Sequence, residues 1–394
     1  MKIVHVVHSL EIGGLENGVV NLVNRLDPQV FKHVICCLSR SGKLAARIPQ
    51  DVKIVELNLP TQQFRLPLIA LARVFRRLRP DLVHTRGWGT IDAVFAAKLA
   101  RIPLVVHGEH GRDWKDVSGS AWKRNRVRWL AGRIIDRYVV VCRFFRDWLQ
   151  AACRIKADKI VCIPNGVDTA RFFPVGQDGT IGANGAAGPG AETRGSLREK
   201  IGLPREGTLF GSVGRLDPVK DFPTLLRGFA EIEKRFPETR LAIAGDGPLR
   251  GELARLTRSL NLEGRVFWLG ERQDVPAILR CLDVFVQASL FEGMSNTILE
   301  AMATGLPIVA TDTGGNGELV ADKENGWLVP VGRPSALARA MESYLADPKL
   351  RSHHGARSRA RALEEFALPV MAERYAGLYQ RLWGEKSRRT FMEN

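Results

Sequence analysis

The chain repeats one local pattern along almost its whole length: a short apolar run, a loop that contains glycine, and then a helical pattern. The first copy consists of the β-branched run 2–8, the turn at Gly13 and Gly14, and apolar residues at helical spacing over 16–23. Similar apolar runs follow at residues 33–38, 52–57, 82–85, 104–107, 138–142 and 160–164. A recurring strand-then-helix order is typical of parallel sheets covered by helices on both faces. The sequence therefore predicts the α/β class with doubly wound sheets.

A second series of the same pattern follows, with apolar runs at 208–213, 241–244, 266–269, 284–288 and 307–311. A chain of 394 residues also exceeds what one hydrophobic core usually supports. We therefore predict doubly wound domains over 1–172 and 201–366. Residues 175–195 are rich in Gly and Ala and lack periodicity, which predicts a flexible insertion and linker over 173–200. Residues 367–394 are predicted to form a helix that packs back on the N-terminal domain and ends in a frayed tail.

Composition narrows the classes of partner. The formal net charge of +16 favours anionic partners, namely nucleic acid, acidic lipid or phosphorylated small molecules. Six cysteines without a C-x-x-C pair are typical of free thiols in a reducing cytoplasm. The N-terminus lacks the pattern of a signal peptide, and no apolar run approaches the roughly 20 residues of a membrane span. We expect a cytoplasmic protein that at most binds the inner face of a membrane.

Basic and aromatic residues alternate over 122–137. This pattern suits an amphipathic helix that rests on anionic lipid headgroups. It equally suits a solvated basic face whose tryptophans pack inward. A nucleic-acid interface is the weaker interpretation, because the basic residues accompany no helix-turn-helix, zinc-finger or RNP-like motif.

The stretch 291–318 contains a loop, a helix, a buried strand and a second glycine loop. Ser295 or Asn296 is predicted to cap the helix, and Gly305 to end it in the left-handed conformation. Glu300 lies in the middle of this apolar helix, so its carboxylate requires either a partner within the protein or a ligand. Glu292 lies just before the helix. Backbone N–H groups at the helix N-terminus suit phosphate or ring hydroxyls; they belong to Gly293, Met294, Ser295 and Asn296.

Three other loops carry candidate residues. Arg215 and Lys220 lie between a strand and a helix, where they suit a diphosphate or are ordinary surface cations. His110 follows a predicted strand, at the edge where open α/β sheets bind ligands, and its side chain suits hydrogen bonding or proton transfer. His107 is three residues earlier, but no third ligand is near enough in sequence to favour a metal. Gly13 and Gly14 either let a ligand approach the backbone or make a tight turn.

With these motifs in order, the chain resembles the retaining glycosyltransferases of family 4. The resemblance covers nearly the whole chain except the Gly/Ala-rich insertion. It rests on the order and spacing of Gly13–Gly14, the His110 loop, the run 164–168 (PNGVD), Gly214-Arg215 with Lys220, the run 245–248 (GDGP), and Glu292 to Glu300, the E-x7-E element of the family. Within the family, the chain is most similar to bacterial sugar transferases of exopolysaccharide gene clusters, including those associated with PEP-CTERM/exosortase systems. A departure is Cys142-Arg143, where many members have Ser.

The resemblance implies a GT-B fold, in which two Rossmann-like domains face a cleft that holds a UDP- or GDP-linked sugar. It implies that Arg215 and Lys220 hold the diphosphate, that Glu300 binds the ribose, and that Glu292 acts on the sugar. The Gly13–Gly14 turn and the amides over 293–296 are assigned to the donor as well.

The resemblance assigns His110 to positioning of the sugar or stabilisation of the transition state, with His107 as the alternative. The acceptor is expected to be a glycan or a polyprenyl-linked glycan. No D-x-D sequence occurs, so we expect neither a metal ion nor another cofactor. Two other functions stay open: a nucleotide-sugar epimerase of the same fold, and a noncatalytic basic nucleic-acid-binding protein.

Overall fold

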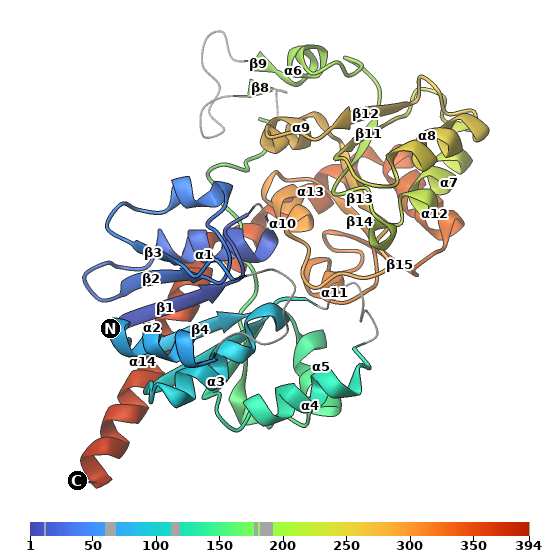
Figure 1. Cartoon of the computed structure of the whole chain (residues 1–394). Helices are drawn as coiled ribbons and strands as arrows, with labels where there is room; N and C mark the ends of the chain where they lie inside the picture. Colours follow the sequence, from blue (N-terminus) through green and yellow to red (C-terminus); the bar gives the residue numbers. More distant parts are fainter. Residues whose placement is uncertain (12, 60–67, 112–118, 177–179, 182–191, 394) are drawn as a thin grey trace. The chain divides into compact units, whose positions relative to one another are not determined.

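The computed structural model describes residues 1–11, 13–59, 68–111, 119–176, 180–181 and 192–393 (Figure 1). The chain forms two compact units. The first, called here the N-terminal domain, comprises Met1–Gly166 and Leu368–Asn394; the second, the C-terminal domain, comprises Val167–Ala367. Each domain is built on a parallel sheet, which confirms the predicted class of two doubly wound α/β domains.

The sheet of the N-terminal domain has seven strands in the order β3-β2-β1-β4-β5-β6-β7, and every neighbouring pair is parallel. Its central strands β1 and β4 are buried except at Lys2, as expected when helices cover both faces, and they carry buried polar residues beside the apolar ones. The strands are β1 (Lys2–Val7), β2 (Lys32–Cys37), β3 (Lys53–Glu56), β4 (Leu82–Arg86), β5 (Leu104–Glu109), β6 (Arg137–Val140) and β7 (Ile160–Cys162).

The helices of the N-terminal domain come from both ends of the chain. They are α1 (Gly14–Val23), α2 (Leu68–Leu78), α3 (Asp92–Leu99), α4 (Trp122–Ala131), α5 (Arg143–Cys153) and α14 (Leu368–Glu393). The last of these, drawn in red in Figure 1, places Leu368, Met371 and Leu378 in one core cluster with Ile3 and Val106 of the sheet.

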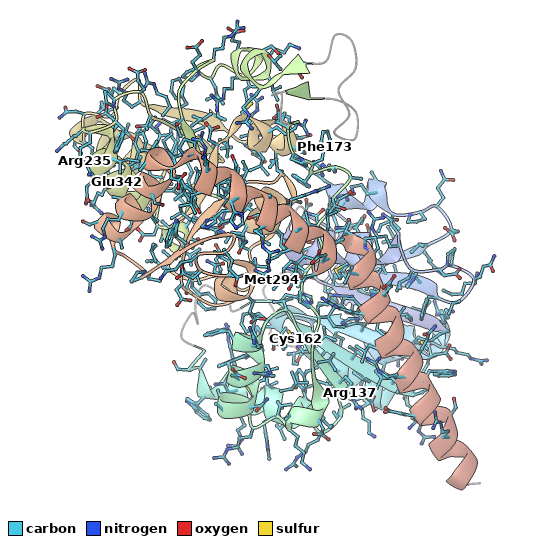
Figure 2. All side chains as sticks on the ribbon, turned by 180° about the vertical axis from the view of Figure 1, so that it is seen from behind. Arg137, Cys162, Phe173, Arg235, Met294 and Glu342 are labelled. Atoms are coloured by element: carbon cyan, nitrogen blue, oxygen red, sulfur yellow. The ribbon has the colours of Figure 1, made fainter. Side chains whose placement is uncertain are left out.

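Polar contacts also tie α14 to the N-terminal domain. The hydroxyl of Tyr379 lies 2.7 Å from His84 Nδ1, and Arg137, labelled in Figure 2, donates to Glu385 at 3.4 Å. This helix therefore completes the core of the N-terminal domain.

The sheet of the C-terminal domain has six parallel strands in the order β12-β11-β10-β13-β14-β15. The strands are β10 (Leu209–Val213), β11 (Arg240–Ala244), β12 (Val266–Gly270), β13 (Val284–Gln287), β14 (Ile308–Thr311) and β15 (Gly326–Val329). The helices are α6 (Arg194–Lys200), α7 (Phe222–Glu233), α8 (Arg250–Ser259), α9 (Val275–Cys281), α10 (Asn296–Ala303), α11 (Asn316–Leu319), α12 (Pro334–Ala346) and α13 (Pro348–Glu364). Arg235, just after α7, is joined to Glu342 of α12 by two hydrogen bonds (both residues are labelled in Figure 2).

The domain boundary differs from the predicted one at residue 172. The chain passes into the C-terminal domain at Val167 and back at Leu368. Val167 donates its backbone N–H to Phe366, and Phe172 is buried and accepts from Arg359, so both belong to the C-terminal domain. These contacts join residues far apart in sequence, and local pattern does not indicate them.

The predicted linker over 173–200 also extends too far toward its C-terminal end. Residues 177–179 and 182–191 lie outside the described part, but β8 (Thr180–Ile181) pairs antiparallel with β9 (Glu192–Thr193). The α6 helix that follows is anchored, because Arg198 is buried and donates to Asp283 at 2.8 Å. The anchoring carboxylate lies in a distant part of the chain.

Candidate functional site

The carboxyl ends of β10, β13 and β14 bring the predicted donor residues together. The strand of this sheet that comes first in the sequence, β10, lies between β11 and β13. The strand order therefore reverses at this point. Ligands of open α/β sheets bind at such a reversal. The loop after β10 carries Arg215 and Lys220, and the loop after β13 leads through Glu292 into α10. The two loops are joined directly, since Leu290 donates its N–H to the carbonyl of Val219 at 2.8 Å.

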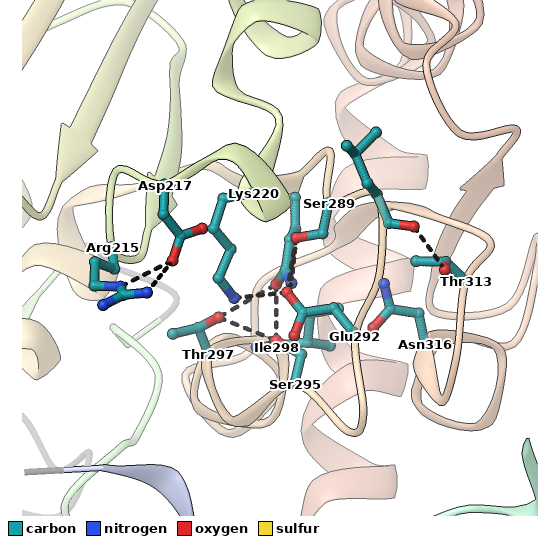
Figure 3. Close-up of polar contacts among 12 residues, drawn as sticks. Arg215, Asp217, Lys220, Ser289, Glu292, Ser295, Thr297, Ile298, Thr313 and Asn316 are labelled. Carbon is teal, nitrogen blue, oxygen red and sulfur yellow. Dashed lines mark hydrogen bonds and ion pairs between the residues drawn. The ribbon is translucent and has the colours of Figure 1, made fainter. Parts of the chain in front are cut away.

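Glu292 is the centre of this site (Figure 3). Its Oε1 accepts from Lys220 Nζ at 2.6 Å, from Ser289 Oγ at 2.7 Å, and from Gln287 Nε2. The Glu292 side chain is only 11% exposed, so its charge is largely removed from water and is matched by a cation at short range. The family resemblance implied that Lys220 binds the diphosphate and that Glu292 acts on the sugar. The structure shows that the two side chains form one ion pair.

Gln287 organises the residues around Glu292, and it was not identified as a site residue from the sequence. This buried amide donates to Ser289 at 3.1 Å, and its Oε1 accepts from Ser295 at 2.8 Å and Thr297 at 3.2 Å. A glutamine at the end of an otherwise apolar buried strand is a signal that was available, because a buried amide requires partners. Sequence alone does not identify those partners.

The predicted cap of α10 is confirmed at Ser295, whose Oγ accepts from the N–H of Ile298 at 3.3 Å. Gly305 then has a φ of 77°, in the left-handed region predicted for the end of this helix. Because the Ser295 hydroxyl is already engaged with Gln287 and with its own helix, its predicted contribution to the sugar is restricted to the backbone. Gly293, Met294 and Asn296 stay predicted donor ligands through their amides.

The second glycine loop closes directly on Glu292. Gly315 donates to the carbonyl of Gly293 at 2.8 Å. Gly314 has a φ of 54°, and a Cβ at this position would overlap the carbonyl oxygen of Glu292. The loop after β14 therefore fixes the backbone that carries Glu292. Position 314 of this loop requires glycine, both for its left-handed conformation and for lack of space.

Arg215 is oriented by a carboxylate of its own loop. Its Nε and Nη2 both lie 2.8 Å from Asp217 Oδ2, while the Arg215 side chain is 73% exposed (Figure 3). Both predicted cations, Arg215 and Lys220, are therefore each matched with one carboxylate. A diphosphate would meet two cations that are already held in place, with N–H groups of the exposed Arg215 still available.

Glu300 differs from Glu292. Within the described ranges, no hydrogen bond or ion pair reaches its carboxylate. Burial raises the pKa of Glu300 to about 7, and the positive charge of Arg171 opposes the shift. A partly desolvated carboxylate without a protein partner has the properties of a ligand-binding group. This observation favours the ligand interpretation of Glu300 over a satisfied core carboxylate.

In the N-terminal domain, His107 and His110 have different surroundings. His107 is fully buried, with Nδ1 2.7 Å from Thr85 Oγ1 and Nε2 3.6 Å from Glu109 Oε1. His110 follows β5 and has a buried Nε2 without a partner in the described chain. Burial lowers the pKa of His110 to about 3, and Arg86 contributes to the shift. An imidazole of such low basicity does not fit the suggested proton transfer by a histidine of ordinary pKa but fits hydrogen bonding.

Gly13 and Gly14 begin α1 at the carboxyl end of β1. Gly13 is the N-cap, and the side chain of Glu16 folds over it, in the space a Cβ would occupy. Both glycines lie in the N-terminal domain, whereas the other predicted donor ligands lie in the C-terminal domain. Their assignment to the donor stays a prediction.

The basic stretch 122–137 contains elements of both sequence interpretations. Arg128 of α4 is buried, between the rings of Trp88 and Trp148 at 4.8 and 4.9 Å from their centroids. Trp122 is instead 65% exposed and Leu130 40% exposed. The expectation of basic residues outside and tryptophans inside is therefore wrong at Arg128 and at Trp122.

Comparisons with known proteins identify the family. The model of the family described as Glycosyl transferases group 1 matches residues 193–361, and that of Glycosyltransferase Family 4 matches residues 12–171. An Escherichia coli UDP-Gal:alpha-D-GlcNAc-diphosphoundecaprenol alpha-1,3-galactosyltransferase is 31% identical over 346 residues, 84% of this chain and 84% of that protein. The chain is a family 4 glycosyltransferase.

Similarity to solved structures places this glycosyltransferase in the GT-B fold. The crystal structure of Anabaena HepE in complex with UDP has a TM-score of 0.81 at 22% identity and covers 97% of this chain and 100% of that chain. A GDP-mannose-dependent alpha-(1-6)-phosphatidylinositol monomannoside mannosyltransferase of Mycolicibacterium smegmatis is 31% identical over 293 residues, 72% of this chain and 71% of that protein.

These comparisons give no support to the two alternative functions, a nucleotide-sugar epimerase and a nucleic-acid-binding protein. No helix in the described part of the glycosyltransferase is long and apolar enough to cross a membrane.

Proposed function

We propose that the chain is a retaining glycosyltransferase that moves a sugar from a UDP- or GDP-linked donor to a glycan or polyprenyl-linked acceptor in cell-surface polysaccharide synthesis. One observation carries the proposal: Lys220 and Glu292 form a largely buried ion pair where the strand order reverses, in a chain of this family. The printed activities of the Escherichia coli and Mycolicibacterium relatives, one UDP-linked and one GDP-linked, support both donor classes.

Each donor group has a proposed partner in the C-terminal domain. The exposed guanidinium of Arg215 and the ammonium of Lys220 bind the diphosphate, and Glu300 accepts hydrogen bonds from the ribose. Glu292 and the amides over 293–296 bind the sugar. When the glycosidic bond breaks, negative charge develops on the leaving diphosphate, and cations that are already fixed stabilise it without reorganising. Charge-assisted hydrogen bonds of this kind each contribute about 1.5–3 kcal/mol.

In this proposal, the leaving phosphate takes the proton of the acceptor hydroxyl, and transfer occurs on one face of the sugar. His110 is assigned to positioning of the sugar through hydrogen bonding, because burial lowers the pKa of its imidazole far below neutral pH. We also propose that the two cations replace a metal ion. Full activity in EDTA is then expected, and a rate that requires added Mn²⁺ or Mg²⁺ would contradict this part of the proposal.

Lys220→Ala and Glu292→Gln test the donor site. Both variants are expected to lose sugar transfer, because each removes one charge of the central pair, while Gln287 and Ser289 retain their own contacts and keep the fold. Exposed residues of the same types supply matched controls, Lys234→Ala and Glu238→Gln, which should transfer sugar at the normal rate. The measurement is release of nucleoside diphosphate from a panel of nucleotide sugars, with thermal unfolding to confirm the fold. Full activity in either site variant would sink the assignment.

We further propose that the enzyme acts at the cytoplasmic face of the membrane and binds anionic lipid through the outer side of α4. The exposed Trp122 and Leu130 supply apolar contact, and Lys123, Arg126 and Arg133 are exposed cations beside them. The relative whose name specifies a diphosphoundecaprenol substrate supports a membrane-bound acceptor.

Flotation with vesicles tests this surface. The enzyme should float with vesicles that contain anionic lipid at low salt, and much less with neutral vesicles. Arg126→Glu is expected to weaken flotation, whereas Arg339→Glu, an equal change of charge at an exposed position of α12, should not. Equal flotation of the two variants would contradict docking through α4.

A further inference from the structure

Gly108 lies within β5, two residues before His110, and backbone conformation does not explain why it is glycine. Its φ is outside the left-handed region that disfavours other residues. The position is held from both sides of the strand, since Gly108 pairs with Arg86 of β4 and with Val139 of β6. Its carbonyl also accepts from the N–H of Gly87 at 2.7 Å. A backbone fixed in this way has little freedom to move aside for a side chain.

The space above Gly108 is occupied by the ring of His110. A Cβ built at Gly108 would lie 2.6 Å from His110 Nε2 and 3.1 Å from its Cδ2. It would also lie 3.4 Å from Cγ of Arg86, which is an ordinary contact. The imidazole therefore folds back over its own strand, into the volume that any larger residue at position 108 would fill.

The residue between them is also fixed. Glu109 is fully buried and accepts from Arg128 Nε at 2.6 Å, and the Arg128 guanidinium lies between two tryptophan rings. Although burial alone raises the pKa of Glu109, the charge of Arg128 and the contact with His107 hold it at about 2. Glu109 thus stays ionised and bound. A group added at Gly108 would displace the His110 ring, because the backbone on either side is held.

We propose that Gly108 is a positioning residue for His110. Because Gly108 has no side chain, it leaves room over β5 for the imidazole, which takes one fixed place at the end of the strand. The inference rests on the proposed function, in which His110 acts on the donor sugar. It adds a specific requirement, namely that position 108 controls catalysis through the location of the ring and without a contact to substrate.

The kinetic test uses Gly108→Ala in the full chain. We expect kcat to fall by roughly 10²-fold, the loss that a misplacement of about 1 Å can cause. Donor KM should change little, because the donor ligands in the C-terminal domain are untouched. The double variant Gly108→Ala/His110→Ala should be no slower than His110→Ala alone, since the ring that Gly108 accommodates is then absent. Gly18→Ala in α1, where a Cβ meets nothing within 4 Å, is the matched control.

A second measurement does not depend on activity. Of the eight histidines, only His110 should show a changed imidazole NMR signal in Gly108→Ala, with its pKa raised toward the ordinary value as the ring leaves its buried place. The missing signal of His110→Ala assigns the resonance.

An unchanged His110 signal, or an equal fall in kcat when Gly108→Ala is introduced with and without His110, would overturn the inference. Loss of the fold in Gly108→Ala would overturn it too, because the backbone and not the ring would then have yielded. If the normal chain transferred no sugar but the NMR result held, the proposed function would fail while the positioning of His110 stood.

Discussion

Glu292 lies just before α10 and Glu300 lies within it, and the two carboxylates have different surroundings. Glu292 accepts from a cation, an amide and a hydroxyl. Glu300 has no such donor among the residues that the structure describes, and its burial raises its pKa to about 7. The protein thus supplies hydrogen-bond donors to the carboxylate proposed for the sugar, and supplies none among the described residues to the carboxylate proposed for the ribose. Because the pKa of Glu300 is raised to about 7, we expect Glu300 to be the carboxylate through which nucleotide binding depends on pH near neutrality.

We predict that nucleotide affinity rises with pH through Glu300. A carboxylate accepts hydrogen bonds from ribose hydroxyls better when ionised, and a group with a pKa of about 7 becomes ionised between pH 6 and 8. The gain corresponds to about tenfold in Kd, if a charged hydrogen bond exceeds a neutral one by about 1.4 kcal/mol. Titration calorimetry with UDP and GDP at pH 6 and 8 measures it.

The variant Glu300→Gln separates this effect from titration of the phosphates, which occurs in both proteins. The difference between the pH profiles of the two proteins is the contribution of Glu300. Identical profiles would show that Glu300 does not titrate against the ligand.

At the scale of residues, the sequence could identify candidate site residues but not their contacts. The E-x7-E spacing and the cations at 215 and 220 were found because each lies in a local pattern of strand end, loop and helix cap. Asp217 and Gln287 were missed because their importance comes from what they contact. Gln287 bonds across a loop to Glu292 and Ser295, and such geometry exists only once the chain is folded.

At the scale of elements, the loop after β14 acts as a support for the loop after β13. The contact of Gly314 with the Glu292 carbonyl is between two backbones, so neither side can relieve an overlap by changing a rotamer. Gly332, in the turn before α12, has a similar φ of 65° but open space around it. The two positions form a natural pair for measuring that contact.

We predict that Gly314→Ala is more damaging than Gly332→Ala. Both substitutions force alanine into the left-handed region, at a cost of about 1–2 kcal/mol. Only Gly314→Ala adds steric overlap, which costs about 1–3 kcal/mol more and shifts Glu292. Unfolding in urea should show the extra destabilisation, and sugar transfer should be lost only in Gly314→Ala. Equal stability and activity of the two variants would mean that the loops do not support each other.

The α4 helix shows what a local sequence pattern can predict and what it cannot. Its basic and aromatic composition suits an amphipathic helix over 122–137, and the structure has a helix over only the first part of this stretch, 122–131. Which arginine is buried depends on Glu109, at the end of β5, and on Trp88 and Trp148. Because these partners come from other elements, the helical period did not single out Arg128.

At the scale of the whole molecule, the chain returns through α14 to complete the N-terminal domain over a group of buried histidines. His5 bonds to His33 at 3.0 Å, and Arg86 donates to both His5 and His84. Tyr379 of α14 contacts His84. These side chains come from β1, β2, β4 and the C-terminal helix, so the parts of the domain most distant in sequence share one polar cluster.

We predict that mild acid destabilises the N-terminal domain more than the C-terminal domain. Burial, reinforced by Arg86, lowers the pKa of His33 to about 4 and those of His5 and His84 well below their ordinary value. Below the unfolded pKa of about 6.5, the unfolded chain therefore binds protons that the folded domain does not, and the free energy of unfolding falls. The loss is about 1.4 kcal/mol per histidine for each pH unit until the folded pKa is reached.

In the C-terminal domain, the protonation of two groups has opposite effects on the free energy of unfolding over the same range of pH. His354 has a lowered pKa and acts like the buried histidines, but the raised pKa of Glu300 makes acid favour the folded state.

Hydrogen exchange followed by mass spectrometry at pH 7 and pH 5, corrected for intrinsic rates, measures the stability of each domain separately. Protection should fall chiefly in β1, β2, β4 and α14, and His33→Gln should reduce that fall by the share of one histidine. An equal loss of protection in both domains would show that the histidine cluster does not govern acid stability.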